Sequence, residues 1–142
     1  MFITRSAPIT LITILYLNSI QLYADVIKFL PDIDLPSAGY LTIHNESNQD
    51  FEIHSVMSKD FERVELHKSI VKNGMSSMQR LEKLTIPANH EIKLEPKGIH
   101  LMLFKPKYKL KHNHKIRLYF FDKNNQEVFN ALLTLKNRTK SN

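Results

Sequence analysis

The stretch GIHLMLF, residues 98–104, decides the fold of this chain, because it is short and almost wholly apolar but contains one histidine and one methionine. Successive side chains of a β-strand point to opposite faces. The aliphatic residues of this stretch then share one face, whereas His100 and Met102 share the other. An unbroken apolar face is typical of a strand packed on a core. The imidazole and the thioether on the opposite face need a separate explanation.

The chain on either side of this stretch also consists of short apolar segments separated by turn residues. Asn73-Gly74 predicts a hairpin, because glycine adopts positive φ without strain. No segment shows an apolar stripe of 3.6-residue period long enough for a major helix, and no repeat or linker divides the chain. The pattern predicts one all-β domain, an antiparallel sandwich or barrel. Its strands are expected at 40–44, 51–57, 64–67, 78–86, 91–94, 99–104, 116–121 and 128–135.

The N-terminus has the pattern of a secretory leader. Arg5 precedes an apolar run at 9–17, and Ala24 is a small residue after which a signal peptidase could cut. The run is short for a membrane span, which needs about 20 apolar residues. We therefore expect residues 1–24 to be a signal peptide and residues 25–142 to form an exported domain without stable membrane insertion after cleavage. An uncleaved anchor is the alternative.

The composition excludes some classes of function. The formal net charge is +6, and many lysines cluster in KPKYKLKHNHK, residues 105–115. Export and the lack of an aromatic-interleaved binding motif argue against nucleic acid as the partner, so we interpret this cluster as a solvated rim that steers an acidic partner. The chain has no cysteine. Any soft-metal chemistry here must therefore use methionine sulfur.

The remaining histidines and methionines suggest such a metal site. Ten residues separate His67 from Met78 across the predicted hairpin, 21 separate Met78 from His100, and one separates His100 from Met102. The hairpin would bring His67 and Met78 to adjacent strand ends. Two imidazoles and two thioethers suit Cu(I), a soft ion, whereas zinc favours thiolate, imidazole or carboxylate and a blue-copper centre needs a cysteine. Spacing alone leaves the strand pairing open.

Other histidines and methionines have ordinary interpretations. Lone methionines such as Met57 and Met75 are expected to fill the core. His112 and His114 could hold a weak secondary metal, but a solvated loop is the simpler interpretation. The remaining lone histidines are expected to be half-exposed strand residues: His44, His54 and His90.

The spacing His67-x10-Met78-x21-His100-x-Met102 resembles the signature of the periplasmic copper chaperone family called PCu(A)C. Segments around the four residues are also similar to that family, and the similarity runs from about residue 35 to residue 135. These segments are AGYLTI with Asn45, VELH at 64–67, Asn73-Gly74, IPA at 86–88 and GIHLML at 98–103.

The resemblance implies a cupredoxin-like Greek-key β-barrel or sandwich that binds one Cu(I) through His67, Met78, His100 and Met102. It also implies delivery of the ion to respiratory cytochrome oxidase, at the binuclear copper centre of subunit II, together in some cases with Sco-type thiol proteins. The chain departs from the family at Lys68, where a methionine is common. Its tail, residues 137–142, lacks histidine and methionine, so we expect no second copper site there.

We therefore expect an exported, periplasmic and monomeric copper carrier without catalysis. The sequence shows no nucleophile–base arrangement, and its three glycines are too few for a phosphate-binding loop. Two alternatives remain open at this stage. One is a periplasmic copper buffer without a dedicated client, and the other is a β-sandwich interaction module without metal.

Overall fold

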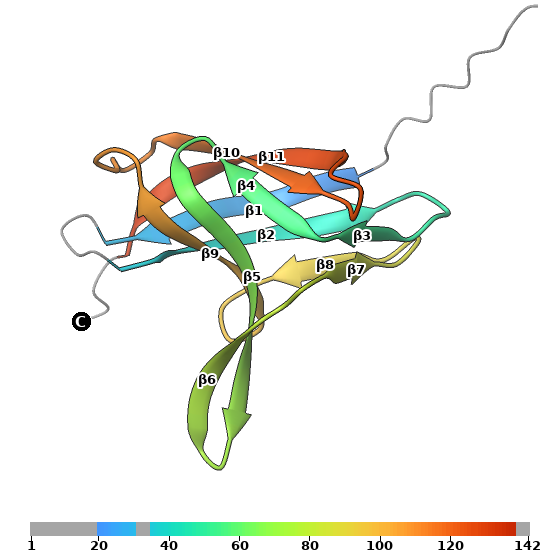
Figure 1. The fold of residues 1–142 in the computed structure, drawn as a ribbon, viewed down its shortest axis with the longest axis horizontal. Helices are drawn as coiled ribbons and strands as arrows, with labels where there is room; N and C mark the ends of the chain where they lie inside the picture. The colour runs from blue at the N-terminus through green and yellow to red at the C-terminus, as the bar shows by residue number, and fades with distance from the viewer. Residues whose placement is uncertain (1–19, 31–34, 139–142) are drawn as a thin grey trace, which may run out of the picture.

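The structure is a computed structural model, and it describes residues 20–30 and 35–138 (Figure 1). The predicted signal peptide lies mostly outside the described residues. Within the described ranges there are strands and turns but no helix, and so no helix that could cross a membrane. The strands are β1 (Ile20–Phe29), β2 (Ser37–Asn45), β3 (Phe51–Ile53), β4 (Ser55–Ser58), β5 (Phe61–Lys72), β6 (Met75–Arg80), β7 (Leu84–Ile86), β8 (Glu91–Leu94), β9 (Ile99–Pro106), β10 (Lys115–Phe121) and β11 (Glu127–Asn137).

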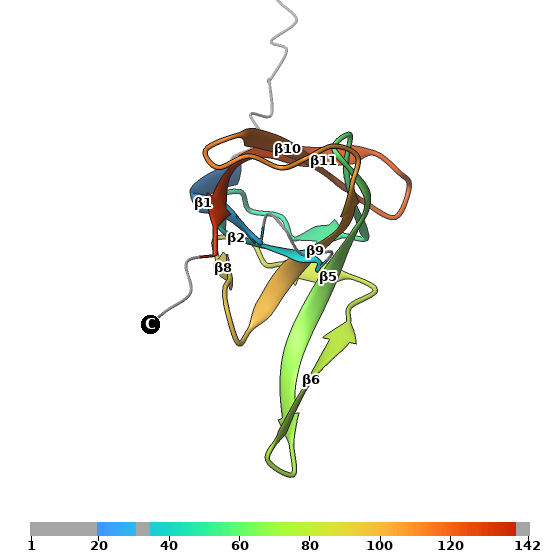
Figure 2. The same cartoon turned by 90° about the vertical axis from the view of Figure 1, so that its left-hand side faces the viewer.

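The main sheet closes into a barrel. Its strand order is β1-β11-β10-β4-β5-β9-β2, and β2 pairs in turn with β1, which completes the ring seen in Figure 2. β8 extends the sheet from β2, β6 extends it from β5, and β3 pairs with β7 in a separate small sheet. A closed ring removes the exposed edges that an open sheet would leave. The predicted all-β barrel is confirmed.

One pairing departs from the expected antiparallel pattern. β1 is antiparallel to β2 but parallel to β11, with Val26 opposite Thr134. Parallel partners need a long connection, and β1 and β11 come from opposite ends of the chain. This strand was not predicted, because its first half falls in the segment assigned to the leader. The register shifts between Tyr23 and Val26, beside the predicted cleavage point, and cleavage after Ala24 stays a prediction.

β5 and β6 form the predicted hairpin, but its strands are longer than expected. β5 continues past His67 to Lys72, and only Asn73 and Gly74 separate it from β6. Both turn residues have positive φ, 52° and 75°, as the tight turns that suit twisted hairpins require. The hairpin projects away from the barrel in both views (Figures 1 and 2).

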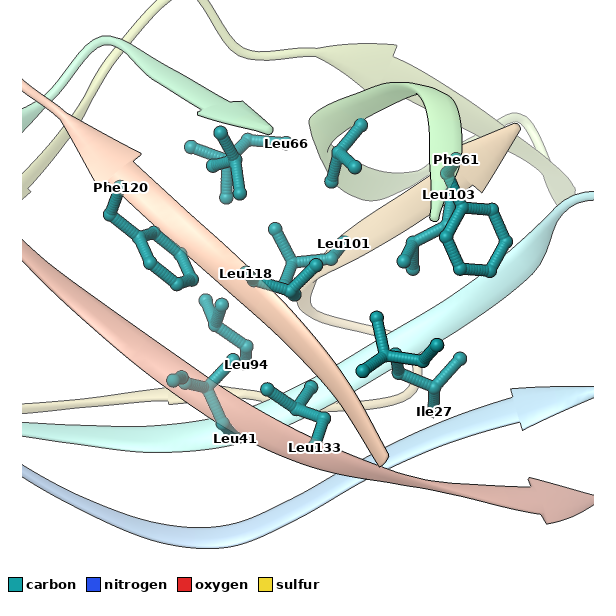
Figure 3. Close-up of a cluster of buried hydrophobic side chains, with 14 of the residues drawn as sticks. Ile27, Leu41, Phe61, Leu66, Leu94, Leu101, Leu103, Leu118, Phe120 and Leu133 are labelled. Carbon is teal, nitrogen blue, oxygen red and sulfur yellow. The ribbon is translucent and has the colours of Figure 1, made fainter. Parts of the chain in front are cut away.

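The barrel interior is filled by aliphatic and aromatic side chains (Figure 3). β5 and β9 each direct alternate residues into it, so Leu66, Leu101 and Leu103 are buried. Burying one such side chain stabilises the fold by roughly 1.5–3 kcal/mol. The intervening residues of the same two strands point outward, and the candidate site lies on that outer face.

Candidate metal centre

The register of β5 against β9 brings three of the four predicted ligands onto one face. His67 lies opposite His100, and Glu65 lies opposite Met102. Directly opposed residues of an antiparallel pair place their side chains on the same side of the sheet. The centroids of the two imidazole rings are 6.1 Å apart. The two histidines therefore form a cross-strand pair, with Met102 next to them along β9.

Met78 joins the same face from β6. It lies opposite Ser69, two residues beyond His67 on β5, and the residue opposite His67 is Arg80. The expectation that His67 and Met78 end adjacent strands is therefore wrong, because β5 extends five residues past His67. Met78 nevertheless lines one open hollow of about 270 Å³ together with His100 and Met102. We call this space, whose lining also includes Ser69, Lys97 and Arg138, the ligand hollow.

The environment of His67 fixes which of its nitrogens is free. Nε2 of His67 lies 2.7 Å from Oε2 of Glu65. The hydrogen bond from His67, together with the positive charge of Arg63, lowers the pKa of Glu65, although burial acts in the opposite direction. An ionised carboxylate only accepts hydrogen bonds, so Nε2 donates. Nδ1 of His67 then keeps its lone pair, and it is buried without a hydrogen-bond partner among the described residues.

His100 is held in the opposite sense. Its Nδ1 lies 3.1 Å from the backbone oxygen of Gly98, an atom that can only accept a hydrogen bond. Nδ1 therefore donates, and the lone pair is left on Nε2, which is buried with no partner in the described ranges. His100 itself is 3% exposed. An unsatisfied buried polar atom costs about 1–3 kcal/mol, so the two on this cross-strand pair are candidate positions for a ligand.

The donor set fits a soft cation. It offers two neutral imidazole nitrogens and the sulfur atoms of Met78 and Met102, and soft thioether ligands select Cu(I). Residues 20–30 and 35–138 contain no group of three or more His, Cys, Asp or Glu side chains that could hold a metal ion. The candidate donors, two imidazole nitrogens and two thioether sulfurs, are not a group of that kind. Met78 is 59% exposed, so the site opens to solvent on the hairpin side.

Two further residues support His67, and the sequence interpretation missed both. Nε of Arg63 lies 2.9 Å from Oε1 of Glu65, so the carboxylate bridges Arg63 and His67. The guanidinium carbon of Arg63 also lies 4.2 Å from the ring centroid of Phe104 on β9. The available signal was the period of two along β5, which places residues 63, 65 and 67 on one face.

The structure does not bring the other histidines and methionines into this site. Met57 and Met75 are 52% and 73% exposed, so the expectation that they fill the core is wrong: Met57 is at an exposed position of β4, and Met75 is on β6, where every residue is exposed. His112 accepts a hydrogen bond from the backbone of Asn137, and the ring of His114 packs against Tyr108.

The lysine cluster lies away from the site. β9 begins beside the hairpin and ends at Pro106, opposite Phe61, so the segment 105–115 follows the far end of that strand. Two other cations, Lys97 and Arg138, line the ligand hollow, and Arg80 lies opposite His67. Steering of an acidic partner toward the site would depend on those residues rather than on the cluster.

Comparisons with known proteins agree with this architecture. Residues 21–132 match the family described as "Putative lipoprotein LpqE-like". A curated protein of Rickettsia prowazekii, "Uncharacterized protein RP573", is 28% identical over 97 residues, which are 67% of this chain and 54% of that protein. The chain thus spans about half the length of this relative.

Solved structures show the same fold. The copper-bound PCuAC domain from PmoF2 matches with a TM-score of 0.66 at 14% identity, over 83% of this chain and 92% of that domain. The solution structure of CuI-DR1885 from Deinococcus radiodurans matches with a TM-score of 0.64 at 22% identity, over 86% and 79%. The cupredoxin-like fold is therefore confirmed. The family match over residues 21–132 places the chain in the LpqE-like family, a PCuAC-type family, which confirms the resemblance given by its sequence.

Proposed function

We propose that this protein carries one Cu(I) ion, bound by Nδ1 of His67, Nε2 of His100 and the sulfur atoms of Met78 and Met102. The observation that supports this most strongly is the pair of buried imidazole nitrogens that have no hydrogen-bond partner among the described residues and share a sheet face with both thioethers. The structural likeness to PCuAC domains solved with copper supports the same metal.

The chemistry of the donors favours transport over permanent storage or catalysis. All four donors are neutral, so they hold the ion less firmly than thiolates would. Nitrogen donors of the two histidines are buried, whereas Met78 is exposed on the hairpin, so one donor can leave while the others still hold the ion. The family is not a known class of enzyme. A carrier that releases its cargo to another protein fits these features.

The destination follows from the family resemblance. We propose export to the periplasm and delivery to the binuclear copper centre of cytochrome oxidase subunit II, with Sco-type thiol proteins as additional partners. Growth phenotypes distinguish such a carrier from a copper buffer without a client. Loss of a carrier impairs oxidase assembly when copper is scarce, whereas loss of a buffer sensitises cells to excess copper.

The direct test is titration of the purified protein with Cu(I) in competition with a Cu(I)-specific chelator. We expect one strong site, and we expect Ag(I), a similar soft ion, to displace the copper. Met57→Ala is the matched control for Met78→Ala, because both methionines are roughly half-exposed on strands. Met78→Ala should weaken binding and Met57→Ala should not. Equal effects of the two substitutions, or no strong site, would overturn the proposal.

A further inference from the structure

The β5–β6 hairpin carries a second hollow that continues from the ligand hollow. Its volume is about 520 Å³, and it shares Ser69, Met78 and Lys97 with the ligand hollow. Its remaining lining residues are Val71, Ser76 and Ser77, all on the hairpin. The two hollows form one trough, here called the hairpin trough, which leads from the candidate donors along β6.

β6 is also unusually open. All six of its residues are exposed, and in the described part of the chain it pairs with β5 alone. Val71 and Met75, beside the turn, are 74% and 73% exposed. Exposed apolar side chains on a protruding hairpin with an open edge are typical of an interaction site.

The backbone direction of β6 can be derived from two hydrogen bonds. The backbone N–H of Leu81 donates to the backbone oxygen of Leu66, so the backbone N–H and C=O groups of even-numbered β5 residues point toward β6. The N–H of Ser69 donates to the backbone oxygen of Gly98, so the backbone groups of odd-numbered residues point toward β9. In the register, Ser77 lies opposite Ile70. The backbone N–H and C=O of Ser77 therefore point toward β5, and those of the residues before and after it point outward. The outward N–H and C=O groups are those of Ser76, Met78 and Arg80.

The charges of the hairpin and of the turn before β9 select the partner. Residues 68–80 contain Lys68, Lys72 and Arg80 and no acidic residue. Lys97 lines both hollows. No described carboxylate forms an ion pair with Lys68, Lys72 or Lys97, so these cations are available to an incoming chain. A second copy of this protein would bring the same positive charges to the edge and be repelled, whereas an acidic chain would be attracted.

We propose that the outer edge of β6 is the docking site for the protein that exchanges Cu(I) with this chain, and that this partner adds an acidic, extended segment to β6 as a further strand. The exchange itself rests on the proposed function. It involves no change of oxidation state: the bond from the sulfur of Met78 to Cu(I) breaks, and a sulfur or nitrogen donor of the partner takes its place. The docking precedes the exchange and needs no metal.

The test uses the metal-free protein, labelled for NMR, and a short synthetic peptide that alternates glutamate with valine and threonine. Binding should shift the amide signals of β6 and slow hydrogen exchange at Ser76, Met78 and Arg80. The same peptide with lysine in place of glutamate should bind about tenfold more weakly or worse, and salt should weaken the acidic peptide. Signals that move at 105–115 instead, or equal binding of the lysine peptide, would overturn the proposal.

Proline at an outward position blocks strand addition without removing a hydrogen bond to β5. Ser76→Pro should therefore weaken binding of the acidic peptide about tenfold or more. Ser76→Ala, which keeps the N–H, should bind the peptide as the unmodified protein does. If Ser76→Pro disturbs the hairpin, Lys68→Ser/Lys72→Ser/Lys97→Ser provides the second test and should weaken binding likewise. Unchanged peptide binding in a folded variant contradicts the proposal. So does hydrogen exchange at the edge amides that slows as the protein concentration rises in the absence of peptide, because a second copy of the protein would then occupy the edge.

These outcomes separate the docking from the metal chemistry. A protein that binds Cu(I) strongly but not the peptide keeps the proposed function and loses the docking site. A protein that binds the peptide at β6 but has no strong Cu(I) site keeps the docking surface and loses the proposed function.

Discussion

The two faces of the β5–β9 pair are built from alternate residues of the same strands but carry different chemistry. Toward the barrel interior lie Leu66, Leu101 and Leu103, each at most 4% exposed. Toward the outside lie His67 and His100, each with one buried nitrogen that has no partner in the described ranges. The inner face is packed in the core, and the outer face carries the candidate donors.

The comparison teaches that burial alone does not identify a core residue. His100 is as buried as the leucine beside it, at 3% against 0% for Leu101. The leucine is stabilised by removal from water, whereas the histidine loses water from Nε2 without gaining a hydrogen bond. Substitutions on the inner face should therefore change the free energy of unfolding, and substitutions on the outer face should change the affinity for Cu(I).

The largest effect is expected for stability on the inner face. Leu101→Ala should lower the free energy of unfolding by about 2–5 kcal/mol, because it opens a cavity in a packed interior. Met102→Ala, on the adjacent and half-buried position, should cost clearly less in the metal-free protein. Denaturant unfolding of both variants measures this difference. Equal losses would mean that Met102 is a core residue and not a ligand.

The next effect concerns metal affinity on the outer face. His67→Ala/His100→Ala should lower the affinity for Cu(I). The loss should exceed the roughly 10–100-fold that is typical when a residue supporting a ligand is changed. Met78→Ala/Met102→Ala should also weaken Cu(I), and Ag(I) should compete less well with what remains, because the softer donors are lost.

Competition titration with a Cu(I) chelator measures both double variants. His44→Ala/His90→Ala is the control, since neither histidine lies on β5 or β9 or lines the ligand hollow. A loss of affinity in this control as large as in His67→Ala/His100→Ala would contradict the assignment.

A smaller effect is expected at Glu65, which bridges Arg63 and His67. Glu65→Gln should weaken Cu(I) by roughly tenfold, because it loosens the tautomer and orientation of the ligating imidazole. The pKa of Glu65 is lowered in the folded protein, so its contribution to stability is present at neutral pH and disappears as the pH falls through that lowered value.

Unfolding followed from neutral to acidic pH should show a shallower loss of stability in Glu65→Gln than in the unmodified protein. Glu62→Gln is the control, because Glu62 is exposed near the start of β5, where it pairs with Lys105 and not with His67. A Cu(I) affinity unchanged by Glu65→Gln would show that Glu65 does not position His67.

The smallest effect lies at the far end of the same two strands. Burial and the hydrogen bond to Asp60 raise the pKa of Tyr108 to about 12. Because the pKa is raised in the folded protein, its contribution to stability is fully present below the ordinary tyrosine pKa of about 10. This contribution is lost as the pH rises toward 12. Asp60→Asn should bring the pKa of Tyr108 closer to 10, as NMR titration of its ring would show. Cu(I) affinity should not change, and a change would mean that the two ends of the pair are coupled.

Much of the fold could be predicted from local pattern. Alternation located the strands around Leu41, Leu101 and Leu118, and Asn73-Gly74 gave the hairpin, because positive φ at a two-residue turn is a strictly local requirement. β1 could not be predicted, since its apolar residues adjoin a run with leader character and its partners come from both ends of the domain.

The sequence named the candidate ligands but not their arrangement. A resemblance in spacing selected His67, Met78, His100 and Met102, but the register that sets His67 against His100 and Met78 against Ser69 depends on pairing between distant strands. Glu65 was visible in the sequence beside Arg63 and His67. Its role depends on a hydrogen bond that only the folded backbone defines.

The measurement that tests the central claim most directly is X-ray absorption at the copper edge of the Cu(I)-loaded protein. The structure predicts a mixed first shell of nitrogen from His67 and His100 and sulfur from Met78 and Met102. In Met78→Ala/Met102→Ala loaded at high copper, the sulfur signal should disappear while the nitrogen signal remains. A first shell of nitrogen and oxygen without sulfur in the unmodified protein would contradict the site on the outer face of β5 and β9.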